Sequence, residues 1–147
     1  MEKGDNVHAI FNRFAKATTV IAETLKSMGK DFMHNDHLGY ILTCPSNLGT
    51  GLRAGAMTKL PLLSARKDFK DLCGKLGLQA RGGGGVDSAA TGGQYDISNA
   101  DRLGKSETTL VNIFIEGVAN FIRWEEMLEK KQDIEGEIAS AKPGVPC

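Results

Sequence analysis

The sequence has few cysteines, no net charge and no long apolar run. Its three cysteines are an odd number and none lies in a Cys-x-x-Cys spacing, which argues against a disulfide framework or a zinc site and fits a reducing cytoplasm. Eighteen basic and eighteen acidic side chains cancel, so no overall field favours nucleic acid or a membrane surface as a partner. The apolar stretches fall far short of the roughly 20 residues that span a bilayer, and no signal segment opens the chain. We therefore expect a soluble, cytoplasmic protein.

What the sequence does have is an ordinary globular composition. Its 147 residues fit one domain, since domains commonly contain roughly 100–200 residues. Apolar residues make up 41% and charged residues 24%, close to the values of soluble globular domains. A disordered, collagen-like or coiled-coil chain is therefore excluded, and one packed core is expected.

Apolar periodicity predicts both helices and strands. A period of three to four residues predicts helices over 6–28, over 63–76 and from Ser106 to about 128. β-prone runs bounded by turn residues predict strands over 38–44, 51–60 and 94–98. The chain after about Gln132 is expected to be frayed, with 138–147 as a flexible tail. Because helices and strands alternate irregularly, the predicted fold class is α+β.

Eighteen glycines are the one unusual feature of the composition, and they gather in two places. The first group, Gly49, Gly51 and Gly55, surrounds Arg53. Glycine leaves backbone N–H groups uncovered and arginine supplies a forked cation, and together these are the parts of a phosphate-binding loop. A tight turn beside a surface arginine would give the same pattern, so both interpretations stay open.

Cys44 lies at the expected end of the strand that precedes this group. One interpretation is a small, buried apolar residue. The other is a reactive thiol, because the Ser46 hydroxyl two residues later could donate a hydrogen bond to a thiolate and lower its pKa.

The second glycine group follows Arg81 directly and begins with Gly82, Gly83, Gly84 and Gly85. Four successive glycines suit no regular element, because each one adds backbone freedom and offers no side chain to pack. One interpretation is a mobile lid that closes the Arg81 guanidinium over a bound anion and excludes water. The other is a disordered connector.

His34 and His37 flank Asn35-Asp36 and are candidate metal ligands. Their spacing is loose and no further cluster of ligand types supports them, which favours a structural or surface role. No metal site in the protein itself is expected.

Two longer strings resemble the phosphagen (guanidino) kinases. They are GYILTCPSNLGTGLR at Gly39–Arg53 and YDISNADRLG at Tyr95–Gly104, and the likeness runs from residue 3 to about 137. It covers only the C-terminal part of the family's catalytic domain. The serine at position 46 and the string GVDSAA at 85–90 are more similar to the creatine kinase branch than to the arginine kinases.

This resemblance implies both a fold and an activity. The fold is an antiparallel sheet with flanking helices in residues 1–137, part of a glutamine synthetase/guanidino kinase-like catalytic domain. The activity is reversible transfer of the ATP γ-phosphoryl group to a guanidino compound such as creatine, glycocyamine or taurocyamine, with Mg²⁺ entering as MgATP. The implied partners are ATP or ADP and the guanidino compound, and an open sheet edge would favour a homo-oligomer.

The resemblance also assigns roles to individual residues. Cys44, helped by Ser46, matches the substrate-site thiol of the family. The residues that match its nucleotide site and lid are Arg53, Arg81, Gly82, Gly83, Gly84, Gly85, Val86 and Asp96. Val86 would also touch the small apolar end of the guanidino substrate. Met57 stands where the branch usually has a histidine near the nucleotide, and Gly83 replaces a lid threonine.

The catalytic glutamates of the family and several of its phosphate-binding arginines lie upstream of what is Met1 here. Two functional hypotheses follow. The first is a phosphotransferase of the creatine kinase type. The second is a catalytically silent fragment or paralogue that binds nucleotide or a partner chain.

Overall fold

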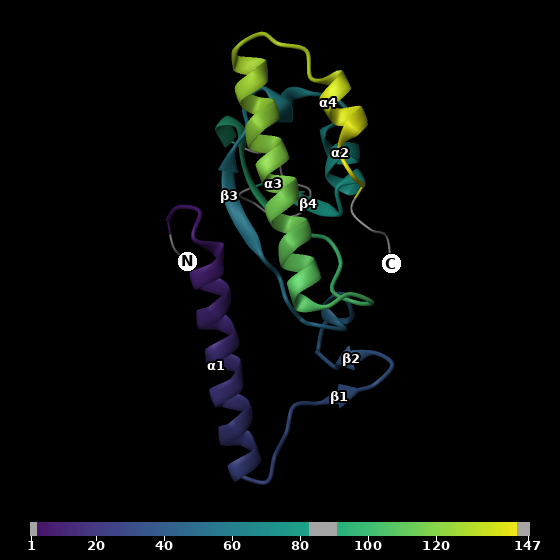
Figure 1. Cartoon of the computed structure of the whole chain (residues 1–147). Coiled ribbons are helices and arrows are strands. Elements are labelled where there is room, and N and C mark those ends of the chain that lie inside the picture. Colours follow the sequence, from purple (N-terminus) through teal and green to yellow (C-terminus); the bar gives the residue numbers. More distant parts are fainter. Residues whose placement is uncertain (1–2, 83–90, 144–147) are drawn as a thin grey trace.

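The computed structural model describes residues 3–82 and 91–143, in which four helices and five strands occur. In chain order these are α1 (Val7–Ser27), β1 (His34–Asn35), β2 (Gly39–Tyr40), β3 (Gly55–Lys59), α2 (Phe69–Lys75), β4 (Leu78–Arg81), β5 (Gln94–Asn99), α3 (Glu107–Glu129) and α4 (Glu135–Ser140). Short 3₁₀ turns lie at Pro45–Asn47, Leu63–Ala65 and Thr91–Gly93. The predicted α+β class is confirmed (Figure 1).

The main sheet has three antiparallel strands in the order β3-β5-β4. Successive side chains of a strand point to opposite faces of its sheet. Ile97 of β5 lies opposite Ala56 of β3 and Ala80 of β4, and these three residues face the hydrophobic core. Asp96, the neighbour of Ile97, lies opposite Arg81 of β4. These two residues are therefore on the other face, which we call the site face.

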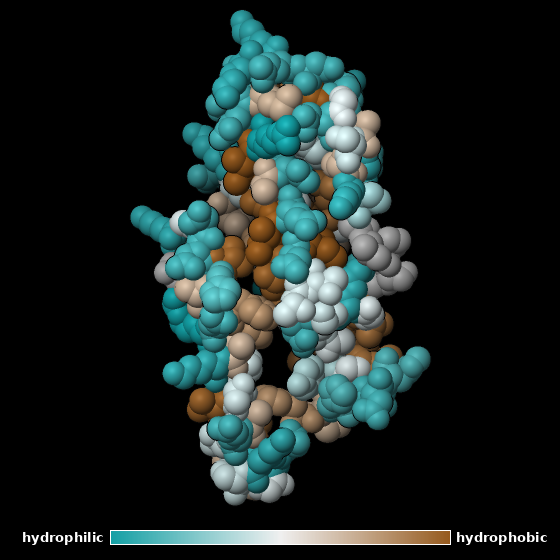
Figure 2. Space-filling view, in the orientation of Figure 1, coloured by the Kyte–Doolittle hydropathy of each residue, from teal (hydrophilic) through white to brown (hydrophobic). Residues whose placement is uncertain are grey.

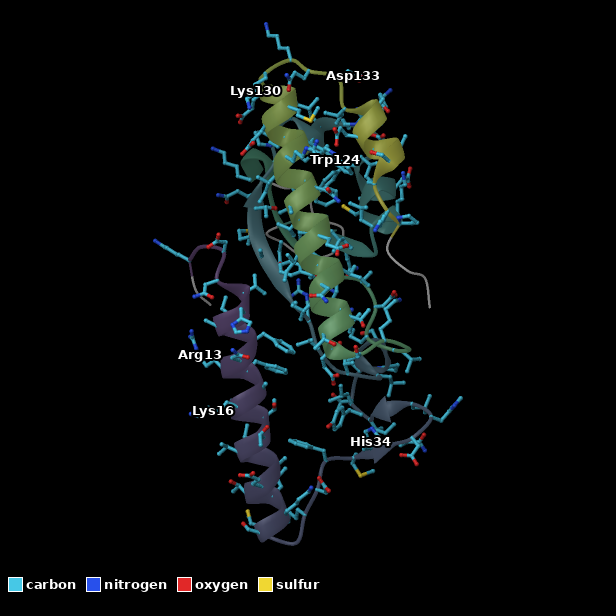
Figure 3. All side chains as sticks on the ribbon, viewed as in Figure 1. Arg13, Lys16, His34, Trp124, Lys130 and Asp133 are labelled. Atoms are coloured by element: carbon cyan, nitrogen blue, oxygen red, sulfur yellow. The ribbon has the colours of Figure 1, made fainter. Side chains whose placement is uncertain are left out.

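The core lies between the sheet and the helices α2 and α3, which pack against β4 and β5 (Figure 1). Among its largest fully buried side chains are Phe121 and Trp124 of α3, whose ring centroids are 5.8 Å apart. Figure 3 labels Trp124 beside the α3 ribbon in this packed region. Because the helices bury one face of the sheet, the site face is left to carry polar and charged side chains.

The two long helices begin where the sequence predicts. The Ser106 hydroxyl accepts a hydrogen bond from the Thr109 N–H at 3.2 Å, which caps α3. The Asn6 side chain accepts one from the Ala9 N–H at 3.1 Å, which caps α1. The predicted strand over 94–98 is also confirmed as β5, whereas the one predicted over 51–60 is confined to β3.

Helix α1 stands apart from the rest of the molecule and has no buried residue (Figure 1). Its apolar side chains Phe14 and Ile21 are 42% and 51% exposed. Arg13 and Lys16 extend from the side of α1 that is turned away from the sheet (Figure 3). In the view of Figure 2 an opening separates the lower part of α1 from the segment that carries β1 and β2. Within the described residues, α1 is thus an amphipathic helix whose apolar side is largely uncovered.

The strand predicted over 38–44 is wrong for most of its length, because only Gly39 and Tyr40 pair, with β1. Ile41 and Leu42 are 38% and 42% exposed and lie outside any strand. An apolar run forms a strand only where another strand completes its hydrogen bonds. Among residues 3–82 and 91–143, β1 pairs only with Gly39 and Tyr40, and no strand lies beside Ile41 and Leu42.

The helix predicted over 63–76 is divided in the structure. A 3₁₀ turn covers Leu63–Ala65, and α2 begins only at Phe69. Between them the Arg66 guanidinium forms two hydrogen bonds with the Asp68 carboxylate, at 2.9 and 2.8 Å. This local ion pair lowers the pKa of Asp68 and places it at the start of α2.

The tail is also better ordered than predicted. Residues 135–140 form α4, and Ile134 and Ile138 are buried in the core, so the expectation of a frayed segment from Gln132 is wrong there. The Lys75 ammonium donates to the Ile138 carbonyl at 2.6 Å, and Arg66 pairs with Glu135 at 2.9 Å. Two isolated apolar residues carried too weak a periodicity to indicate this helix.

No helix in the described ranges is long and apolar enough to cross a membrane.

Candidate functional site

The site face of the sheet brings together three residues that the sequence singled out. Asp96 lies at the centre of the sheet on β5, and Arg81 lies opposite it on β4. Arg53 comes just before β3, and its Nη2 donates to Asp96 Oδ2 at 2.5 Å. The strand register therefore places both arginines beside the same carboxylate.

Arg53 is held in place by two residues of β5. Besides the contact with Asp96, its Nε donates to the Ser98 hydroxyl at 3.1 Å. Gly55 makes room for this arrangement, since a Cβ there would lie 3.1 Å from Asp96 Oδ1 and 3.2 Å from the Ser98 Cβ. The Arg53 side chain is about one-third exposed, so part of it stays accessible to a ligand.

Arg81 has fewer partners than its burial requires. Its Nη2 donates to the Gln79 side chain at 3.0 Å, but its buried Nε has no hydrogen-bond partner in the described structure. A buried donor without an acceptor is costly. Gly82, the next residue, is buried, whereas Gly83, Gly84, Gly85 and Val86 lie outside the described residues.

A third arginine, Arg102, belongs to the same cluster and was not predicted as a site residue. It is only 7% exposed, its Nη1 donates to the Ala100 carbonyl at 2.8 Å, and its Nε has no partner. Burial lowers the pKa of Arg102, and the positive charges of Arg81 and Arg53 lower it further. The string YDISNADRLG contains this cation, and its place in that string was the signal that could have identified it.

Gly49 is the residue that lets the chain approach Arg102. The Thr50 N–H donates to the Arg102 carbonyl at 2.9 Å, and a Cβ on Gly49 would overlap that same carbonyl. Its φ of +102° also favours glycine. At Gly49 the glycine therefore serves a close backbone contact, which is nearer to the tight-turn interpretation than to an open row of N–H groups.

The thiol of Cys44 lies in the loop that this contact anchors. Its Sγ is 3.0 Å from the Ser46 hydroxyl oxygen, and the residue is exposed. The hydrogen bonds of Ser46 lower the pKa of Cys44, with a smaller contribution from the Arg102 charge. Cys73, by contrast, is in the core, where burial raises its pKa to about 12. Cys147 lies outside the described residues.

The two histidines are exposed and lie in the hairpin of β1 and β2. The Nδ1 of His34 is 3.9 Å from Asp36 Oδ1, and its ring meets that of Tyr40 edge to face at 5.0 Å. His34 and His37 line a groove of about 360 Å³ that Arg102 also lines. No group of three His, Cys, Asp or Glu side chains in the described part of the chain could hold a metal ion.

Another groove lies between α3 and α4. It measures about 500 Å³ and includes the ion pair of Arg123 with Glu137. None of the predicted site residues lines it. The candidate site is therefore the cluster of Arg53, Arg81 and Arg102, not this groove.

Residues 1–128 match the family described as ATP:guanido phosphotransferase, C-terminal catalytic domain. The chain belongs to this family. The predicted resemblance to the phosphagen kinases is thus confirmed, and this family uses MgATP.

Two curated relatives are creatine kinases. They are the testis isozyme of Oncorhynchus mykiss and the B-type enzyme of Gallus gallus. Each aligns with 97% of this chain and is 51% identical to it over the aligned residues. The flagellar creatine kinase of Strongylocentrotus purpuratus is 52% identical over 91% of it. The chain spans only 37% of the length of the first two and 11% of the third.

Solved structures show the same fold. A lombricine kinase crystal structure aligns with 95% of this chain at a TM-score of 0.86 and 46% identity. The substrate-free duplicated taurocyamine kinase of Schistosoma mansoni aligns with 88% of it at a TM-score of 0.77 and 40% identity. The alignments cover 38% and 18% of those chains.

Proposed function

We propose that this chain carries the phosphate-binding face of an ATP:guanidino phosphotransferase of the creatine kinase type. The reaction is the reversible transfer of the γ-phosphoryl group of MgATP to the guanidino nitrogen of a small compound, with creatine, glycocyamine and taurocyamine as the candidates. Membership of the family and the 51% identity to two creatine kinases support the reaction class.

The observation that carries the proposal is the cluster of Arg53, Arg81 and Arg102. Three guanidinium groups meet at one face of the sheet, and among residues 3–82 and 91–143 only Asp96 forms an ion pair with any of them. The buried Nε atoms of Arg81 and Arg102 also lack acceptors in the described structure. Phosphate oxygens supply both the negative charge and the acceptors that such a cluster needs.

The chemistry of phosphoryl transfer suits this arrangement. The protein contributes chiefly by positioning the reactants and by stabilising charge on the transferred group. Arginines provide that stabilisation, while the Mg²⁺ of the nucleotide shields the phosphates during transfer. Cys44, with a pKa lowered by Ser46, would place a thiolate near the guanidinium of the substrate.

The second hypothesis is a chain that binds nucleotide or a partner chain without turnover. It is favoured by the 37% share of the creatine kinases that the chain spans and by the uncovered apolar side of α1. An open sheet edge would also permit a homo-oligomer. Cytoplasmic localisation is part of the proposal, and the described cysteines, Cys44 and Cys73, are both free thiols.

Titration calorimetry with MgATP and MgADP, together with a coupled assay in both directions, separates these hypotheses. Binding with turnover on one of the three guanidino compounds supports the phosphotransferase. Binding without turnover by this chain alone, with turnover restored when the N-terminal remainder of a creatine kinase is supplied, also supports the phosphotransferase. Binding without turnover in both cases supports the silent chain. Absence of any nucleotide binding would refute the phosphate-binding face itself.

A further inference from the structure

Asn99 is fully buried at the end of β5, and its side chain connects the segments that carry two of the three arginines. Its Oδ1 accepts a hydrogen bond from the Ala54 N–H at 2.7 Å. Its Nδ2 donates to the Leu52 carbonyl at 3.0 Å and to the Asp101 carbonyl at 2.7 Å. Both N–H groups of the amide and its oxygen are therefore paired.

The three partners of the Asn99 amide lie next to two of the site arginines in the chain. Leu52 and Ala54 are the two neighbours of Arg53, so the amide holds the backbone on both sides of that arginine. Asp101 is the residue directly before Arg102. One buried side chain thus fixes the backbone at Arg53 relative to the backbone at Arg102.

We propose that Asn99 is a positioning residue for phosphate binding: its buried amide sets the spacing and orientation of Arg53 and Arg102. This inference rests on the function proposed above. Asn99 does not touch the ligand and acts only through the two arginines. The candidate site would then include Asn99 as well as the charged side chains that it positions.

An amide is the group that this place requires. The two carbonyl oxygens of Leu52 and Asp101 accept only, and the Ala54 N–H donates only, so the orientation of the amide is determined. An aspartate would accept from Ala54 but would set a carboxylate against two carbonyl oxygens. An alanine would leave all three backbone groups, which are buried or partly buried, without this partner.

Arg102 has little means of correcting a shifted backbone. Its side chain is buried, and its Nη1 donates a hydrogen bond to the carbonyl of Ala100, the residue next to Asn99. On its other side, its own carbonyl is held by the Thr50 N–H. A displacement at Asp101 would therefore be transmitted to the guanidinium instead of being absorbed by side-chain rotation.

The test compares Asn99→Asp with Ile134→Ala in the full 147-residue chain. Ile134 lies in the core and is only 1% exposed, and it belongs to none of the segments that carry Arg53, Arg81 or Arg102. Its truncation therefore controls for lost stability. Melting temperature is measured for both variants. Binding of inorganic tripolyphosphate and of MgATP is then measured by calorimetry well below the lower melting temperature.

We expect Asn99→Asp to weaken tripolyphosphate binding by about tenfold or more, the effect of misplacing one charge-assisted hydrogen bond. Ile134→Ala should bind as the wild type does, even when it melts as early. Equal affinities in Asn99→Asp and the wild type would overturn the inference, and so would an equal loss in Ile134→Ala.

A spectroscopic readout separates this inference from the proposed function. In NMR spectra the Nε–H signals of Arg53 and Arg102 should move in Asn99→Asp but not in Ile134→Ala. If wild-type protein binds no polyphosphate, the proposed function fails and the ligand-binding role of Asn99 fails with it. The arginine signals still report whether Asn99 orients the two side chains.

Should Asn99→Asp not fold, the wild type alone decides the matter. Coupling between two sites is reciprocal, so tripolyphosphate bound at the arginines should shift the Nδ2 proton signals of Asn99. Unchanged Asn99 signals at saturating tripolyphosphate would contradict a positioning role.

Discussion

The Arg53 guanidinium donates to the Asp96 carboxylate at 2.5 Å, although 43 positions separate the two residues. The pairing of β3 with β5 creates this contact by carrying both residues to the site face of the sheet. Asp96 balances one positive charge of a cluster that contains three. The remaining positive charge is the feature on which the binding predictions below depend.

Arg53→Ala and Arg81→Ala should each weaken MgATP binding. A charge-assisted hydrogen bond is worth about 1.5–3 kcal/mol, which corresponds to about tenfold to 150-fold in affinity. Calorimetry on both variants measures the loss. Arg123→Ala is the matched control, because that arginine is exposed on α3 and pairs with Glu137. A variant of Arg53 or Arg81 with wild-type affinity would remove that residue from the site.

Cys44 should be the most reactive of the three thiols at neutral pH. Its pKa lies below the ordinary 9.0 because of hydrogen bonds to Ser46, so its thiolate forms at lower pH than that of an unperturbed cysteine. Mass-mapped alkylation across a pH series gives the midpoint for each thiol.

Ser46→Ala is the companion variant for this measurement. Loss of the hydroxyl should raise the pKa of Cys44 and move the alkylation midpoint to higher pH. Cys73, with a pKa raised to about 12 by burial, should stay unlabelled while the protein is folded. If Cys44 and Cys147 react alike and Ser46→Ala changes neither, the activated thiol is disproved.

Phe121→Ala and Phe14→Ala should affect the free energy of unfolding very differently. Phe121 is fully buried, and truncation of a core phenylalanine costs about 3–5 kcal/mol. Phe14 lies on α1 and is 42% exposed, so its truncation should cost less than about 1 kcal/mol, as surface substitutions usually do. Urea denaturation of both variants checks this. Comparable losses would mean that the apolar side of α1 is covered in solution.

The 147-residue chain alone should show little or no kinase turnover. A single arginine can be worth roughly 10³–10⁵ in the rate of phosphoryl transfer, and the resemblance places several further arginines and the catalytic glutamates outside this sequence. The coupled assay with creatine, glycocyamine and their phosphorylated forms measures this directly. Turnover near the 1–100 s⁻¹ usual for kinases would show that the chain is a complete catalyst.

Local sequence predicted those elements that carry strong local signals. The long helices α1 and α3 follow from apolar periodicity and from caps at Asn6 and Ser106, and β5 follows from a short β-prone run. Prediction of secondary structure failed where contacts between residues far apart in the chain determine the structure. Ile41 and Leu42 are β-prone but lack a neighbouring strand among the described residues, and α4 owes its place to contacts of Ile138 and Glu135 with distant residues.

For the candidate site, residue type and spacing were enough to name the chemical groups: Arg53 and Arg81 near glycines, Asp96, and Cys44 two residues before Ser46. These are local facts. The folded chain was needed to show that the arginines converge, that Arg102 joins them, and that Asn99 connects the backbones at Arg53 and Arg102. Strand register and burial depend on pairings between residues far apart in the chain, which no local pattern records.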